Sequence, residues 1–174
     1  MKTMLFLLIA ALGFSSFSFS EAITRVGINY VDLEVDETDY TYAFSVDGWG
    51  FSIDSAPNEQ VLLTLDYFRL DEDGESADFN VMTAGYAIGG DLSEGAFTVG
   101  LARFDSDLAD SADYDIEVGY SRRAGGEEID YTFSIIASEE TTFRAKIMTP
   151  VGVTFGLMTD GDVDLWNLGY EYKF

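Results

Sequence analysis

The sequence contains neither cysteine nor histidine. Without cysteine the chain cannot be cross-linked by disulfides, so its stability has to come from a large sheet or core. Because the chain has neither residue type, the usual zinc sites and the histidine-based and cysteine-based catalytic arrangements are excluded. We therefore expect no enzymatic activity, no catalytic residues, no bound metal and no cofactor.

Basic residues are also scarce. Nine Lys and Arg stand against 32 Asp and Glu, which gives a formal net charge of −23. This balance excludes a nucleic-acid-binding protein, because such a protein needs a basic surface. However, the chain is 47% hydrophobic and 15% aromatic, which is too apolar for a disordered acidic segment. Acidic and apolar residues must therefore be separated by position in a folded chain.

Long apolar runs are missing after the first twenty residues. Residues 5–14 (LFLLIAALGF) follow Lys2 and precede small polar residues, with Ser18 and Ser20 at the spacing that a signal peptidase reads. This layout predicts a cleaved secretory signal peptide over residues 1–20 and a mature domain over 21–174. The mature chain has no segment suited to a transmembrane helix. If it is embedded in a membrane, it has to be a closed β-barrel, because only helices and barrels satisfy every backbone polar group in lipid.

What the mature chain does have is alternation of apolar and polar residues from Ile23 onward. In one clear case Tyr114, Ile116, Val118 and Tyr120 alternate with Asp115, Glu117, Gly119 and Ser121. Strict alternation predicts strands with one apolar face. Breaks rich in Gly, Asp, Asn and Ser occur at 36–39, 55–59, 71–76, 89–95, 105–113, 122–128, 138–141, 148–152 and 160–162. These breaks predict ten strands, or eight if the pieces near Pro150 and near Trp49, where the pattern slips by one residue, are not separate strands.

Side-chain volume indicates which face points outward. The interior of a barrel of about eight strands is just filled by side chains, so the many Tyr, Phe, Val and Leu residues would overfill it. The opposite face carries small residues, among them Gly27, Gly100, Ala102, Gly119, Gly156 and Gly169. This favours an all-β, closed antiparallel transmembrane barrel with its apolar face toward lipid. A soluble periplasmic or secreted barrel or sandwich that binds an apolar ligand stays open as the alternative.

Charged residues fall on the small-residue face of the predicted strands. They are Asp115, Glu117, Asp130, Arg144, Lys146, Glu171 and Lys173. Because isolated charges inside a barrel would be costly, we expect these residues to form an internal salt-bridge network. Asp115 with Glu117 could in principle serve glycoside hydrolysis, but both would lie inside the barrel, without access for a sugar.

The acidic loops raise the possibility of divalent-cation binding. Two runs place oxygens at alternate positions: Asp71, Asp73 and Glu75, and Asp160, Asp162 and Asp164. Neither run completes the calcium-binding loop with its closing glutamate. Solvated loops that resist aggregation are therefore the favoured interpretation.

The last strand carries the most specific pattern in the chain. Its outward positions are Trp166, Leu168, Tyr170, Tyr172 and the terminal Phe174. With the signal peptide, this ending resembles the small, porin-like outer-membrane β-barrels of Gram-negative bacteria, whose terminal strand is read by the barrel-assembly machinery. The resemblance implies an outer-membrane location and, for an even number of strands, both termini in the periplasm. The breaks at 36–39, 71–76, 105–113, 138–141 and 160–162 would then be the outer loops. They are shorter than is usual in that family, which argues against an adhesin.

The function expected from the sequence is that of a non-enzymatic outer-membrane barrel. Its role would be structural, or passage of small solutes through a narrow lumen, and a filled lumen is equally compatible with the pattern. The expected partners are outer-membrane lipid, lipopolysaccharide and the assembly machinery, and the expected state is a monomer.

Overall fold

The computed structural model describes residues 23–37, 43–72, 75–106, 114–125, 128–138 and 141–174. The predicted signal peptide, together with Tyr40, Tyr42 and Asp73, lies outside the described residues. Among the described residues no helix is long and apolar enough to cross a membrane.

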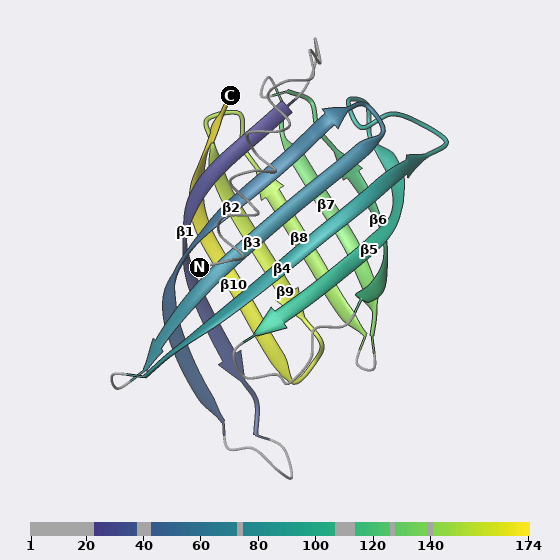
Figure 1. Cartoon of the computed structure of the whole chain (residues 1–174). Coiled ribbons are helices and arrows are strands. Elements are labelled where there is room, and N and C mark those ends of the chain that lie inside the picture. The colour runs from purple at the N-terminus through teal and green to yellow at the C-terminus, as the bar shows by residue number, and fades with distance from the viewer. Residues whose placement is uncertain (1–22, 38–42, 73–74, 107–113, 126–127, 139–140) are drawn as a thin grey trace.

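Ten antiparallel strands form one closed barrel, so the predicted fold and the strand number of ten are confirmed (Figure 1). The strands are β1 Ile23–Val35, β2 Phe44–Asn58, β3 Val61–Glu72, β4 Glu75–Ile88, β5 Ala96–Ser106, β6 Tyr114–Arg122, β7 Asp130–Ala137, β8 Thr142–Met148, β9 Val153–Thr159 and β10 Val163–Lys173. Each strand pairs with its neighbours in the sequence. The ring closes where β1 pairs with β10, from Arg25↔Lys173 to Val35↔Val163, so no sheet edge is left open along this seam.

The two ends of the barrel differ. We call the end with the β1–β2, β3–β4, β5–β6, β7–β8 and β9–β10 connections the loop end, and the opposite end, which includes the C-terminus, the turn end. Strands β1 to β4 have 12 to 15 residues, whereas β6 to β9 have 7 to 9. The hairpins of β1–β4 therefore extend beyond the rest of the wall at the loop end (Figure 1).

Two predicted breaks are misplaced. At 71–76, Asp71 and Glu72 belong to β3, and Glu75 and Ser76 belong to β4. Residues 55–59 were expected to form a turn, but β2 continues to Asn58 and β3 begins at Val61. The Asn58 side chain accepts hydrogen bonds from the backbone amides of Gln60 and Val61, 2.9 Å each, and so shapes a tight turn. The register shifts between Ser55 and Asn58, an irregularity that accommodates Pro57 within a strand.

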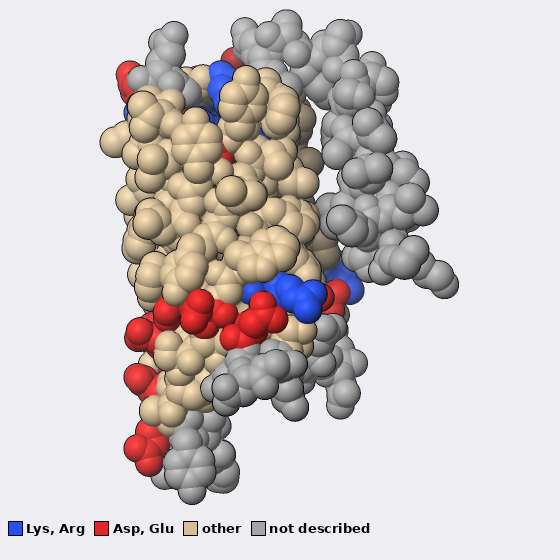
Figure 2. Space-filling view, turned by 90° about the vertical axis from the view of Figure 1, so that its left-hand side faces the viewer, with Lys and Arg blue, Asp and Glu red and all other residues tan. Residues whose placement is uncertain are grey.

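Apolar side chains cover the outside of the barrel wall, as the volume argument predicts. Ile28, Val118, Phe155 and Tyr170 are 72%, 47%, 46% and 53% exposed. Figure 2 shows this uncharged surface as a continuous tan wall, with charged side chains gathered below it toward the loop end. The inward positions of the same strand segments hold glycine and polar residues, including Gly27, Asn29 and Thr154.

This inside-out pattern reverses near the loop end. On β1 the outward residues Ile28 and Tyr30 are followed by outward Asp32 and Glu34, and from Val31 onward the inward residues are apolar. Among the described residues, the pattern reverses on seven strands. Counted from the turn end toward the loop end, the first outward polar residues on these strands are Asp32, Asp47, Arg69, Asn80, Arg103, Thr159 and Asp164. The first inward apolar residues beside them are Val31, Val46, Phe68, Val81, Ala102, Met158 and Leu165. We call the ring of these positions the reversal line, and it explains the slip of the pattern near Trp49.

The lumen is therefore filled in layers. Near the turn end, Ala56, Leu62, Ala87, Leu92 and Ala96 form one buried apolar cluster. Near the loop end, Val31, Phe68, Leu70 and Leu165 form a second. Along β3, Thr64 and Asp66 lie between Leu62 and Phe68, so a polar layer separates the two clusters.

Candidate functional site: a charged layer inside the barrel

Five of the seven charged residues singled out in the sequence lie in this polar layer. Glu117, Asp130, Arg144, Lys146 and Glu171 are at most 7% exposed. Neighbouring strands place them there because each stands at an inward position of its strand.

The other two predicted residues do not join the layer. Asp115 is half-buried on β6, two positions nearer the loop end than Glu117, and has no basic group within 4 Å in the described part of the chain. Lys173 is exposed at the turn end, where its Nζ donates a hydrogen bond to the carbonyl of Gly125.

The structure adds four charged residues that the sequence interpretation missed. Arg25, Asp54, Asp66 and Arg123 are all at most 7% exposed. The alternation could have identified the first three, since each stands between two residues of the outward face. Arg123 gave no such indication, because it follows the end of β6 within a predicted turn.

The centre of the layer is a group of two cations and three carboxylates. Asp66 accepts hydrogen bonds from Arg144 Nη2 at 2.5 Å and from Lys146 Nζ at 3.3 Å. Lys146 also lies 2.7 Å from Glu171 Oε1, and Arg144 Nη1 lies 3.5 Å from Glu117 Oε1. Residues from β3, β6, β8 and β10 thus meet across the lumen and tie opposite walls together.

Hydroxyl groups complete this central group. Ser52 donates to Glu171 Oε1 and Ser134 to Glu117 Oε1, both at 2.6 Å. Arg144 Nη2 also donates to Thr64 at 3.1 Å. Such hydrogen bonds offset part of the cost of placing charges away from water.

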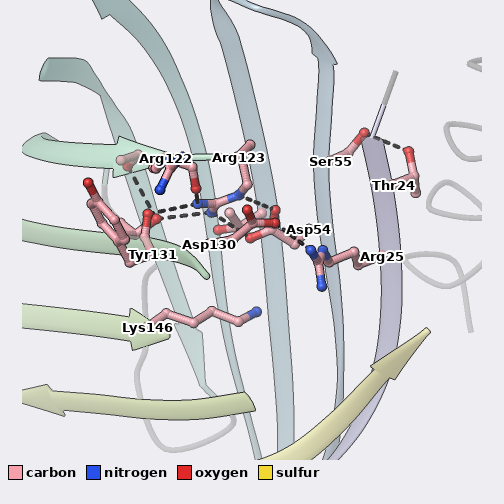
Figure 3. A network of polar contacts seen from close by, with 12 residues as sticks. Thr24, Arg25, Asp54, Ser55, Arg122, Arg123, Asp130, Tyr131 and Lys146 are labelled. Atoms are coloured by element: carbon pink, nitrogen blue, oxygen red, sulfur yellow. Dashed lines mark hydrogen bonds and ion pairs between the residues drawn. The ribbon is translucent and has the colours of Figure 1, made fainter. Parts of the chain in front are cut away.

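A second set of ion pairs lies toward the turn end (Figure 3). Arg123 donates to both carboxylate oxygens of Asp54, at 2.7 and 2.8 Å. Its remaining donors reach the carbonyls of Arg122 and Tyr131 and the hydroxyl of Thr132. Arg25 pairs with Asp130, whose other oxygen accepts the Ala124 amide. Figure 3 shows the two carboxylates between the guanidinium groups of Arg123 and Arg25.

Beside the central group the described residues leave little space. A cavity of about 20 Å³ lies beside Asp66, Arg144, Lys146 and Asn167, enough for about one water molecule. A larger recess of about 270 Å³ lies at the turn end, among Ile23, Ala56, Leu92, Arg123 and Lys173.

The connection between β4 and β5 covers part of the turn end. Leu92 is 1% exposed and packs into the apolar cluster there. Its amide donates to the carbonyl of Glu59, and its own carbonyl accepts from the amide of Arg123. Asp91 accepts hydrogen bonds from Ser93 and from the Glu94 amide, and these bonds lower the pKa of its carboxyl group.

The residues of the proposed assembly signal line the outside of β10. Leu168, Tyr170, Tyr172 and Phe174 are 51%, 53%, 61% and 74% exposed, and Trp166 is half-buried. Tyr172 and Phe174 contact each other edge to face, and Trp166 lies beside Tyr30 of β1.

No cluster of three or more metal-ligating residues occurs among the described residues. Asp160 instead accepts hydrogen bonds from the amides of Asp162 and Val163 and shapes the β9–β10 turn. Asp71 lies 3.6 Å from Arg69, on the outer surface.

Comparison with protein families and with curated proteins finds no match. Among solved structures, the chain is similar to Ail, the attachment invasion locus protein of Yersinia pestis, with 15% identity, a TM-score of 0.37 and coverage of 88% of this chain and 99% of Ail. A structure of Ail with the heparin analogue sucrose octasulfate gives a TM-score of 0.35 at the same identity and coverage. Neisserial surface protein A (NspA) is 11% identical with a TM-score of 0.33, over 86% of this chain and 95% of NspA. The assignment of the fold as a closed ten-stranded barrel follows from the strand pairing itself.

Proposed function

We propose that this chain is a non-enzymatic, integral β-barrel protein of the bacterial outer membrane, with a filled lumen and a structural role. The observation that carries the proposal is the reversal line. A soluble barrel would keep apolar residues inside along its whole length, whereas a membrane barrel exposes them only where lipid surrounds it. Here both arrangements occur on the same strands, on either side of one boundary.

The height of the apolar wall supports this proposal. On β10 the outward face is apolar from Trp166 to Phe174. Eight residue steps cover about 26 Å along a strand, and the tilt usual in such barrels reduces this to about 20 Å along the membrane normal. This is close to the apolar band of outer-membrane barrels, about 25 Å.

The filled lumen favours a structural role over solute passage. Four cations and five carboxylates occupy the polar layer at 7% exposure or less, and the cavity beside them holds about one water molecule. We infer that lipid and lipopolysaccharide are the partners of the folded protein, that it is monomeric, and that the outward face of β10 is read by the assembly machinery.

Two measurements test the proposal. The purified, refolded protein should insert into lipid vesicles and migrate differently on gels before and after heating. Recovery of the protein in soluble form without detergent or lipid would contradict a membrane location. In planar bilayers the inserted protein should give no stepwise currents, and regular current steps would instead support narrow passage of solutes.

A further inference from the structure

Charge is unevenly distributed around the barrel at the reversal line. On the adjacent strands β10, β1 and β2, the first outward polar residues are Asp164, Asp32 and Asp47. On β3, β4 and β5 the corresponding residues are Arg69, Asn80 and Arg103, and Asp78 of β4 stands opposite Arg69. If the apolar wall spans a membrane, as proposed above, these side chains lie at the level of the lipid headgroups of the leaflet at the loop end.

The two arginines are available to a ligand from the lipid phase. The side chain of Arg69 is 45% exposed, donates one hydrogen bond to Ser76, and lies 3.6 Å from Asp71. The side chain of Arg103 is 34% exposed, lies 3.6 Å from Asp105, and stacks over the ring of Tyr114 at 5.5 Å. A guanidinium group has five N–H donors, so neighbouring side chains leave most of these donors unused within the described residues.

We propose that Arg69 and Arg103 bind phosphate groups of lipids, so that anionic lipids gather on the β3–β5 side of the barrel. Guanidinium groups bind phosphate through paired, charge-assisted hydrogen bonds. The carboxylates on β10, β1 and β2 repel the same headgroups. Figure 2 shows basic side chains next to acidic ones along the lower edge of the uncharged wall.

The chain has two tryptophans, and they report on the two sides separately. Trp49 lies on β2, where the acidic and the basic side meet, and stands opposite Arg69 across the β2–β3 pair. Trp166 stands opposite Asp32 across the β1–β10 pair. The variant Trp166→Phe keeps only Trp49, which samples the basic side. The variant Trp49→Phe keeps only Trp166, which samples the acidic side.

The probe is phosphatidic acid with a spin label near the top of its acyl chain, added in trace amounts to phosphatidylcholine vesicles. We expect about fivefold greater local enrichment of this lipid, measured by fluorescence quenching, at Trp49 than at Trp166. Phosphatidylcholine with the same label should quench both tryptophans to a similar extent. Arg69→Gln should remove the excess at Trp49, whereas Arg122→Gln at the turn end should leave it unchanged.

Equal quenching of the two tryptophans by labelled phosphatidic acid would overturn the proposal, and this comparison needs no arginine variant to fold. An excess at Trp49 that survives Arg69→Gln would also overturn it. If labelled phosphatidylcholine quenched neither tryptophan, the membrane barrel itself would be refuted, which separates the two failures.

Discussion

At the scale of single residues, Arg144 illustrates why the inner charges depend on one another. It is 5% exposed and faces the carboxylates of Asp66 and Glu117. A buried ion pair contributes little net stability compared with apolar packing, but removing one partner leaves the other charge buried and uncompensated.

Arg144→Met is therefore expected to lower the free energy of unfolding by about 3–5 kcal/mol. Urea unfolding of the refolded protein in lipid, followed by tryptophan fluorescence, measures the change. The matched control is Arg122→Met at the turn end, whose pair with the exposed Glu128 is worth about 0–1 kcal/mol. Equal losses in the two variants would contradict the network as a source of stability.

At the scale of elements, β2 and β3 approach each other closely at two glycines. A Cβ atom at Gly50 would lie 2.1 Å from the backbone carbonyl oxygen of Tyr67, and one at Gly48 would lie 2.0 Å from that of Arg69. Because the obstructing atoms belong to the backbone, a side chain could not be accommodated by a change of rotamer.

Gly50→Ala is expected to destabilise the barrel by about 1–3 kcal/mol. Gly90→Ala is the control, since its Cβ would meet no atom closer than 3.5 Å, and its effect should stay within about 0.5 kcal/mol. Thermal unfolding monitored by gel mobility compares the two. A neutral Gly50→Ala would show that the strands separate easily there.

The β4–β5 connection is the element that closes part of the turn end. Leu92→Ala removes the side chain that enters the apolar cluster and should cost about 2–5 kcal/mol. Glu94→Ala changes an exposed side chain in the same connection and should have little effect. Proteolysis at the turn end offers a second measurement, because a loosened connection is cut faster.

At the scale of the whole molecule, the reversal line sets the position of the barrel in the membrane. Ile28 and Glu34 both point outward from β1, on opposite sides of that line. Ile28→Lys should lower the free energy of unfolding in lipid by about 2–4 kcal/mol, since it places a charge among acyl chains. Glu34→Lys should change the free energy of unfolding by no more than about 0.5 kcal/mol. Similar losses for the two variants would contradict the position assigned to the membrane boundary.

Much of this arrangement could be predicted locally, because a strand alternates its side chains between two faces whatever surrounds it. The breaks at 89–95, 138–141 and 160–162 match the observed strand ends. The prediction of a turn at residues 55–59 was wrong. Pro, Asn and Ser are typical of turns, but here most of these residues belong to an irregular part of β2.

The sequence by itself determined an all-β chain of strands with one apolar face each, because alternation and turn chemistry depend on near neighbours. It favoured ten strands and a closed barrel with its apolar face outward, but left eight strands and a soluble barrel or sandwich open. Only the tertiary structure decided which charges meet: Asp54 and Arg123 are 69 residues apart, and Arg144 and Asp66 are 78 apart. Such pairs depend on how strands are staggered around the ring, a property of the closed sheet that no short stretch of sequence specifies.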